Sequence, residues 1–272
     1  MKHSHQHLVL FFCLSAMMAT TSTPAQADDD PQRFAAADSE GVEAKRDNTT
    51  LYLEVGPQVK GSVTIPRLAA PLRSMKWGGS DDDAGLLLNP GLDTWQISWK
   101  HRPRDAATLI LAFDTEPLLI DEVKPVKPTS DGSYVLPAHL AETDGEKIRY
   151  EPQPHKNTVG FWVGKEDSAN WRIDLDRPGR FSVAILQGCG KGQGGSDADV
   201  LFHVDTSIPL QVIDFKVVET GHWQVFRWVH VGEVELGTPG EVRVGVMPKR
   251  IKKAALMDIR AIHLIRLPDA ER

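Results

Sequence analysis

Apolar and polar residues alternate with a period of two along most of the chain after residue 48. In TTLYLEVG (residues 49–56) the apolar Leu51, Leu53 and Val55 alternate with other residues, which is typical of a strand with one buried face. Similar short segments follow at 61–68, 85–91, 94–101 and 106–113. Clusters of Gly, Pro or Asp separate these segments, so they predict an antiparallel β-sandwich.

The alternation stops after Phe113, where Pro117, Pro125 and Pro128 lie among charged residues. Such a segment is typical of a stiff, extended connector. The period of two then returns and continues to the end of the chain, and only PAHLAE (137–142) suggests a short helix. We therefore expect an all-β fold with two β-sandwich domains in tandem, the second a jelly-roll or galactose-binding-like module. The expected domains are residues 49–128 and 129–268.

The first 48 residues do not share this pattern. Lys2 precedes the apolar run LVLFFCLSAMMA (8–19), and Ala25-Gln26-Ala27 matches an A-x-A cleavage site. These features predict a signal peptide at residues 1–27 and a secreted or periplasmic protein. Polar residues 28–48 are interpreted as a flexible leader. No other apolar run reaches the roughly 20 residues of a membrane span.

Charge and cysteine content narrow the function further. The formal net charge is −6, and only MPKRIKK (247–253), interpreted as a solvated turn, is locally basic, so nucleic acid is not an expected partner. Of the two cysteines, Cys13 lies in the predicted signal peptide, which leaves Cys189 without a partner. The core rather than disulfide bonds must then hold the fold together.

Gly190–Gly195, GKGQGG, matches the G-x-G-x-x-G pattern of dinucleotide-binding loops. That function requires a helix after the glycines, because the N-terminus of the helix holds the pyrophosphate. The residues that follow, SDADVLFHV, alternate as a strand does. We therefore interpret the glycines as a loop between strands and predict no nucleotide cofactor.

Several longer segments resemble a known family. TTLYLEV and GSVTIPRL resemble the first β-sandwich that follows the catalytic barrel of secreted bacterial α-L-fucosidases. The second half resembles the carbohydrate-binding-module-like jelly roll fused behind that sandwich and behind some sulfatases. The segments that carry this second resemblance are IRYEPQPHKNTVGFW, NWRIDLDRPGRFSVAILQGCGKGQGGSDADV, ETGHWQVF, VGEVELGTPGEVRV and ALMDIRAIHL.

The resemblance covers residues 49–268 and implies a non-catalytic protein. The fucosidase barrel of ~250 residues, which carries the catalytic groups, has no counterpart before Thr49. We therefore expect a carbohydrate-binding accessory protein rather than an enzyme, with a glycan or polysaccharide as ligand. The alternative is a structural or interaction module in which Leu51–Leu53 and Val63–Ile65 leave an apolar patch that docks a separate glycoside hydrolase or a surface protein.

Sugar sites combine an exposed aromatic ring with polar side chains that bind hydroxyls. Strand parity places Trp171 in the core and sets Trp162 on the opposite face to Phe161, which makes Trp162 a candidate platform. The expected carbohydrate-binding residues are Trp162, Lys165, Glu166, Asp167, Asn170, Lys191, Gln193, His222 and Trp223. The other four tryptophans, Trp228 among them, are expected in the core or between domains.

The resemblance also implies a cation site. Modules of this type often hold a structural calcium ion between an acidic residue of the first strand and one near the last. Glu151 and Asp258 occupy these two places. Calcium takes six or more oxygen ligands, of which these residues supply the acidic ones.

Overall fold

The computed structural model describes residues 32–34, 41–79, 85–103, 107–203 and 211–268. The chain divides into two units, Met1–Asp30 and Pro31–Arg272, and all the described residues belong to the second. The predicted signal peptide lies outside the described residues.

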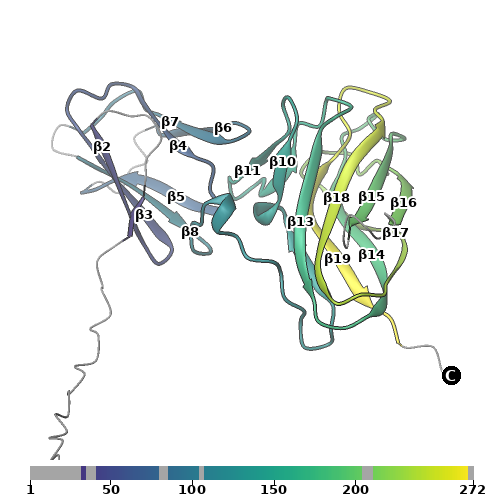
Figure 1. Cartoon of the computed structure of the whole chain (residues 1–272). Coiled ribbons are helices and arrows are strands. Elements are labelled where there is room, and N and C mark those ends of the chain that lie inside the picture. The colour runs from purple at the N-terminus through teal and green to yellow at the C-terminus, as the bar shows by residue number, and fades with distance from the viewer. Residues whose placement is uncertain (1–31, 35–40, 80–84, 104–106, 204–210, 269–272) are drawn as a thin grey trace, which may run out of the picture. The chain divides into compact units, whose positions relative to one another are not determined.

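The strands up to residue 113 form two antiparallel sheets (Figure 1). The first has the order β1-β2-β3-β8-β5, and the second has the order β4-β7-β6. Trp95 of the second sheet stacks on Phe113 of the first, with ring centroids 6.4 Å apart, so the two sheets form a sandwich. The bounds are Gln32–Phe34 (β1), Val42–Asp47 (β2), Thr50–Val55 (β3), Ser62–Pro66 (β4), Leu72–Trp77 (β5), Leu87–Pro90 (β6), Thr94–Ser98 (β7) and Thr108–Phe113 (β8).

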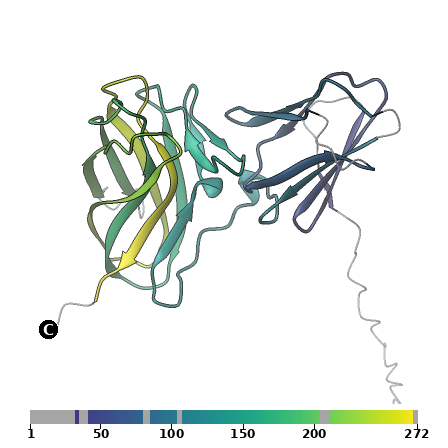
Figure 2. The same cartoon turned by 180° about the vertical axis from the view of Figure 1, so that it is seen from behind.

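The strands after residue 133 form two further sheets, drawn in teal to yellow in Figures 1 and 2. One has the order β10-β13-β18-β15-β16, and the other has the order β11-β12-β19-β14-β17, with β9 pairing to β19. The bounds are Tyr134–Pro137 (β9), Glu142–Asp144 (β10), Arg149–Glu151 (β11), Thr158–Gly160 (β12), Ser168–Leu175 (β13), Gly179–Gly188 (β14), Asp197–His203 (β15), Gln211–Lys216 (β16), Phe226–Leu236 (β17), Gly240–Arg250 (β18) and Asp258–Arg266 (β19).

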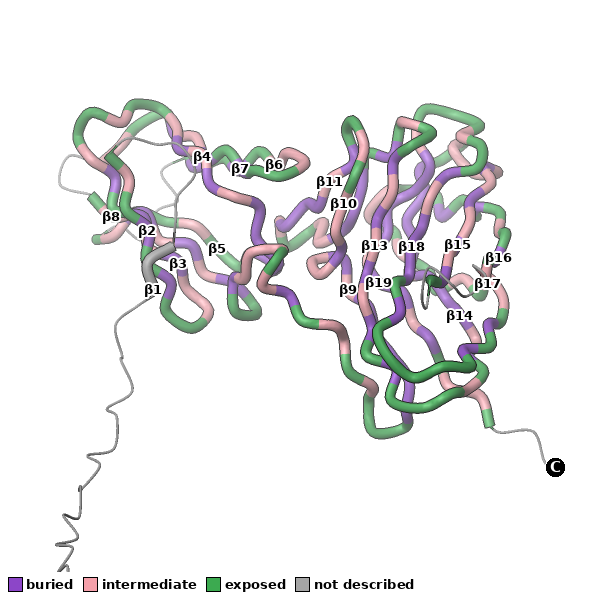
Figure 3. The backbone as a smooth tube through the Cα atoms, viewed as in Figure 1, coloured by how far each residue is buried: buried purple, intermediate pink, exposed green. Residues whose placement is uncertain are grey.

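These four sheets confirm the predicted all-β class. The described helices are two 3₁₀ turns, η1 (Ile120–Glu122) and η2 (Ala138–Leu140), and η2 lies where PAHLAE suggested a short helix. No helix among the described residues has the length and apolar character that crossing a bilayer requires. Buried residues alternate with more exposed ones along many of the strands (Figure 3), as the period of two predicts.

Three strands of the first sandwich were not anticipated, and β1, which pairs with β2, lies in the segment interpreted as a flexible leader. Strand β2 begins at Val42, inside the segment interpreted as a flexible leader, and pairs with β3. Its buried positions are held by Ala44 and Arg46, and the Arg46 guanidinium contacts Glu122 at 2.6 Å. Because a charged residue, Arg46, occupies a buried position, the sequence of this strand does not show the alternation of apolar and polar residues. Strand β5 is also new, because only its two end residues are buried.

The docking alternative relied on apolar residues that the fold buries. Leu51, Leu53 and Ile65 are fully buried and Val63 is 2 % exposed. They form the core of the first sandwich rather than an outer patch. The prediction of a docking surface built on these residues is therefore wrong.

Candidate functional site

One pocket of the second sandwich gathers several of the predicted residues. It has a volume of about 340 Å³ and lies where the ends of β11, β12 and β19 meet the turn before β17. We call it the carboxylate pocket. It is lined by Glu151, Lys156, Phe161, Val163, Trp223, Gln224, Ala255 and Asp258.

Glu151 and Asp258, the predicted cation ligands, lie close together at this pocket. They are 4 % and 7 % exposed, respectively. Gly160 separates them: a Cβ at this residue would lie 2.7 Å from Asp258 Oδ1 and 3.2 Å from Glu151 Oε2. Only a residue without a side chain leaves room for both carboxyl groups here.

The charges of this pair are balanced in two different ways. Lys156 Nζ lies 2.6 Å from Glu151 Oε1. Burial, and secondarily the charge of Glu151, raise the pKa of Asp258 to about 8, so this carboxyl group is largely protonated at neutral pH. The proton on Asp258 and the ammonium group of Lys156 therefore neutralise the two carboxyl groups that a bound cation would otherwise neutralise.

The acidic pair fits a calcium site only in part. Two carboxylates that repel each other in a buried place favour a bound cation. The described residues bring no third His, Cys, Asp or Glu side chain to them, and Lys156 already holds one carboxylate. The calcium site stays a prediction, in which Glu151 and Asp258 would hold the ion and Lys156 would move away.

A tight turn positions Lys156. The backbone N–H groups of Lys156 and Asn157 both donate to the carbonyl of Gln153, at 2.8 and 2.9 Å. Asn157 adopts a positive φ of 44°, a conformation that asparagine tolerates better than most residues. Its side-chain oxygen accepts a hydrogen bond of 2.9 Å from the Tyr150 hydroxyl. The ammonium group therefore sits on an ordered turn.

The aromatic ring from the segment after β12 is Phe161, not Trp162. Trp162 is fully buried, and its Nε1 donates to the Val159 carbonyl at 3.0 Å. Phe161 is 41 % exposed and has a φ of 62°. This left-handed residue ends the strand and reverses the parity, so that Phe161 and Val163 face outward. The prediction that Trp162 is the platform is therefore wrong.

Trp223, the second predicted aromatic residue, does line the pocket and is partly exposed. The Thr220 hydroxyl ties its turn to the preceding loop, donating to the His222 carbonyl and accepting from the Cys189 N–H at 2.8 Å. The Trp223 ring lies over Gly190, where a Cβ would come within 2.8 Å of it. The glycine cluster thus makes room for a ring, and β15 rather than a helix follows it, as the loop interpretation requires.

The predicted hydrogen-bonding residues are absent from the lining of this pocket. Lys165, Glu166, Lys191 and His222 are exposed on the surrounding loops. Asn170 lies on β13, where its side chain donates to Ser168 Oγ at 3.3 Å. The Gln193 side chain accepts from the Ala254 N–H at 3.1 Å. The structure brings Trp223, Glu151 and Asp258 together and leaves these others outside.

Asp167 has a structural role. It is 1 % exposed, and its Oδ2 accepts hydrogen bonds of 2.8 Å from the backbone N–H groups of both Val163 and Gly164. Its Oδ1 accepts from the Glu146 N–H at 3.1 Å. These bonds fix the loop that carries Phe161. Asp167 therefore shapes the pocket wall and is not free to bind a ligand hydroxyl.

Five lining residues of the pocket were not predicted from the sequence, and three of them, Phe161, Lys156 and Gln224, carry aromatic or polar side chains. Strand parity places Phe161 on the face opposite the candidate Trp162, and the left-handed turn that exposes Phe161 has no sequence signal. Lys156 follows Pro-His in a loop, and its proximity to Glu151 depends on the turn. Gln224 directly follows the predicted residues His222 and Trp223, and this position is its only sequence signal.

Trp228 was expected in the core or between domains, yet it is 52 % exposed. It lies on β17 opposite Leu186, and its ring is 5.9 Å from that of His263. Trp228 therefore stands on the outer face of its sheet and outside the carboxylate pocket. Strand β17 alternates, but apolar residues occupy both of its faces, so parity could not assign this one.

The carboxylate pocket combines two kinds of contact. Phe161 and Trp223 supply partly exposed aromatic rings, and the Arg149 guanidinium carbon lies 3.3 Å from the centroid of the Phe161 ring. Gln224, Lys156 and Asp258 supply hydrogen-bond donors and acceptors. This mixture suits a ligand with C–H faces and hydroxyl groups.

No protein-family model matches the chain, and no curated protein sequence matches it significantly. Solved structures do match in shape. The α-L-fucosidase from Vibrio sp. strain EJY3 is 12 % identical, with a TM-score of 0.34, over 82 % of this chain and 39 % of that one. The Podospora anserina GH26-CBM35 β-(1,4)-mannanase is 15 % identical, with a TM-score of 0.37, over 52 % of this chain and 29 % of that one.

An isolated module also matches. CBM35 from Cellvibrio japonicus Abf62 is 15 % identical, with a TM-score of 0.38, over 49 % of this chain and 92 % of that one. This chain thus spans less than half the length of the mannanase and the fucosidase, and most of the isolated module. All three TM-scores lie below 0.5, so the case for a function rests on the residues of this chain.

Proposed function

We propose that this chain is a glycan-binding protein whose ligand occupies the carboxylate pocket. The observation that carries the proposal is the presence of two partly exposed aromatic rings, Phe161 and Trp223, beside Lys156 and Asp258 in one pocket. A sugar ring would lay its C–H face on an aromatic ring and direct its hydroxyls to the polar groups. The pocket volume of about 340 Å³ suits one or two sugar residues.

The wider role that we propose is that of a non-catalytic protein that is secreted or periplasmic. The A-x-A pattern at Ala25–Ala27 supports export. The resemblance to the domains behind a fucosidase barrel supports a role in holding a glycan for a separate glycoside hydrolase. Lys156 already pairs with Glu151, which leaves this carboxylate poorly placed for the two-carboxylate chemistry of glycoside hydrolysis.

A glycan array with the purified protein, including fucosylated and sulfated ligands, tests the proposal. We expect binding that Trp223→Ala and Phe161→Ala each weaken by about tenfold or more, because each removes a stacking surface. Trp228→Ala is the matched control, since it removes an exposed tryptophan outside the pocket.

A blank array from folded protein would overturn the glycan-binding proposal. If Trp228→Ala is the only variant that removes binding, the glycan site would lie instead on the outer face of the sheet that contains β17.

A further inference from the structure

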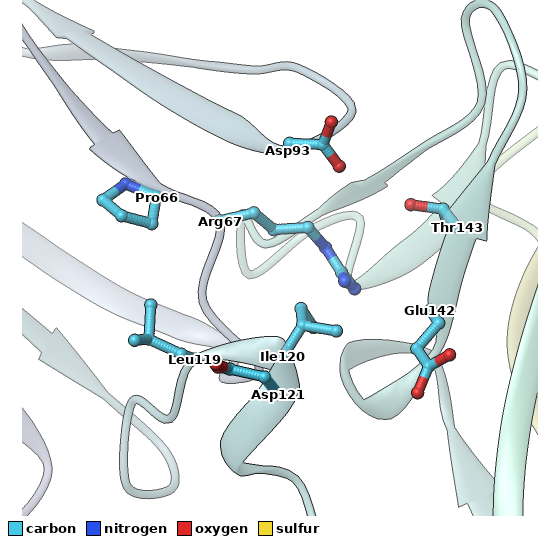
Figure 4. A pocket seen from close by; sticks show the side chains of 8 residues that line it. All are labelled: Pro66, Arg67, Asp93, Leu119, Ile120, Asp121, Glu142 and Thr143. Carbon is cyan, nitrogen blue, oxygen red and sulfur yellow. The ribbon is translucent and has the colours of Figure 1, made fainter. Parts of the chain in front are cut away.

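A second pocket lies where β4, the turn before β7, η1 and β10 meet (Figure 4). It has a volume of about 480 Å³. Its lining includes Arg67, Asp93, Ile120, Asp121 and Thr143. We call it the junction pocket. None of its lining residues belongs to the carboxylate pocket.

Arg67 is the central feature of the junction pocket. It follows β4, is 4 % exposed, and extends its guanidinium group into the pocket (Figure 4). Its backbone N–H donates to the Asp93 carbonyl at 2.8 Å, which fixes the start of the side chain. At the other end, Nη2 donates to the His139 carbonyl at 3.5 Å, and the guanidinium carbon lies 5.3 Å from the Tyr150 ring centroid. Its Nε is buried without a hydrogen-bond partner.

No carboxylate of the described residues forms an ion pair with Arg67. Glu142 lines the same pocket, but its two oxygens contact Arg172 at 3.4 Å and Arg243 at 3.6 Å. Figure 4 shows its carboxylate turned away from Arg67. Burial lowers the pKa of Arg67 to about 10, so the group stays charged at neutral pH. A buried charge without a counter-ion is costly.

The neighbouring groups do not form the missing ion pair: the charges of Asp93 and Glu142 raise the pKa of Arg67 only in part against its burial. Burial, with the charge of Arg67 second, lowers the pKa of His139 to about 4, so that its ring is neutral. His139 Nδ1 and Thr143 Oγ1 are both buried without a hydrogen-bond partner. Asp93 and Asp121 are exposed lining residues. Their carboxylates can accept hydrogen bonds from hydroxyls, and they repel a ligand with several negative charges.

We propose that the junction pocket binds a small hydroxylated carboxylate, such as an acidic sugar. The ligand carboxylate accepts hydrogen bonds from the Arg67 guanidinium, with its free Nε, and from the Thr143 hydroxyl. Hydroxyls of the ligand donate to Asp93 and Asp121. The apolar side chain of Ile120 packs against the carbon skeleton. This inference is independent of a ligand in the carboxylate pocket.

Isothermal titration with glucuronate tests the proposal, with glucose and inorganic sulfate as comparison probes. Glucose matches the shape without the charge, and sulfate supplies an oxyanion without the sugar. We expect glucuronate to bind and the two comparison probes to bind at least about tenfold more weakly, because the carboxylate and the hydroxyls contribute together. Equal binding of glucose or of sulfate would overturn the assignment.

Variants locate the binding. Arg67→Gln should weaken glucuronate binding by about tenfold or more, and Arg73→Gln, which removes a surface arginine paired with Asp114, should leave it unchanged. Ile120→Trp fills the pocket while keeping Arg67, and should also abolish binding. The Ile120→Trp variant still tests whether glucuronate binds in the junction pocket if Arg67→Gln fails to fold. Binding that survives in folded Ile120→Trp, or that Trp223→Ala removes instead, would contradict the junction site.

Discussion

The two pockets treat buried charge in opposite ways. In the carboxylate pocket, Glu151 and Asp258 lie together, and Lys156 and a bound proton compensate them. In the junction pocket, Arg67 is equally buried, and its contacts are a carbonyl group and an aromatic ring, while the acidic lining residues form no ion pair with it. The first cluster is therefore balanced within the chain. The second lacks a counter-ion, which is why we infer a ligand there.

The largest expected effect is the pH dependence set by Asp258. Its pKa is about 8 in the folded chain and about 4 in an unfolded one, so between these values the folded state holds a proton that the unfolded state has lost. The contribution of this residue to the free energy of unfolding therefore falls as pH rises from about 4 to about 8, by roughly 1.4 kcal/mol per pH unit at its steepest.

Chemical denaturation of Asp258→Asn beside the wild type, both in EDTA, measures this contribution. The amide mimics the protonated acid, so the variant should lack the decline. Parallel curves for the two proteins would refute the assignment. Calcium added at pH 8 should then stabilise the wild type and not the variant, if Glu151 and Asp258 hold the predicted ion.

The next largest effect is expected from Lys156→Met. This change removes the ammonium group and leaves Glu151 buried beside Asp258 without its ion-pair partner. Removing one partner of such a pair costs about 3 kcal/mol. Urea unfolding at pH 7 is the measurement, and Lys165→Met, an exposed lysine on a nearby loop, is the control. A loss no greater than that of the control would show that the pair is not a buried one.

The smallest effect on stability is expected from Arg67→Met. Methionine has a similar length and needs no counter-ion, so the lost contacts with His139 and Tyr150 are offset by the removal of an unpaired charge. We expect a change within about 1 kcal/mol in either direction. A loss as large as that of Lys156→Met would mean that Arg67 is well compensated in the free protein, and the comparison between the pockets would fail.

Strand periodicity predicted much of the fold, and its failures have local causes. Trp171 is 1 % exposed, as its parity on β13 requires. The same reasoning failed at Trp162, because Phe161 takes a left-handed conformation that turns its own ring outward and Trp162 inward. It failed for β2 because Arg46 occupies an inward position.

The two pockets differ in how much of each the sequence could reveal. Glu151 and Asp258 were paired through a family resemblance, and Trp223 through its place beside a turn. Arg67 gave no signal, because its importance lies in what surrounds it. Tyr150 and His139 reach it from far along the chain, and the diversion of Glu142 to other arginines depends on strand pairing. The lack of an ion-pair partner for Arg67 can therefore be recognised only from the structure.

The ring of Trp223 resting on Gly190 has a consequence for how this sequence can change. A methyl group at residue 190 would overlap the indole, so alanine there is acceptable only with a smaller side chain at residue 223. The two positions thus form a compensating pair, 33 residues apart in the chain. In evolution, a substitution of Gly190 would therefore have to follow the loss of the Trp223 ring. That loss would also remove part of the wall of the carboxylate pocket.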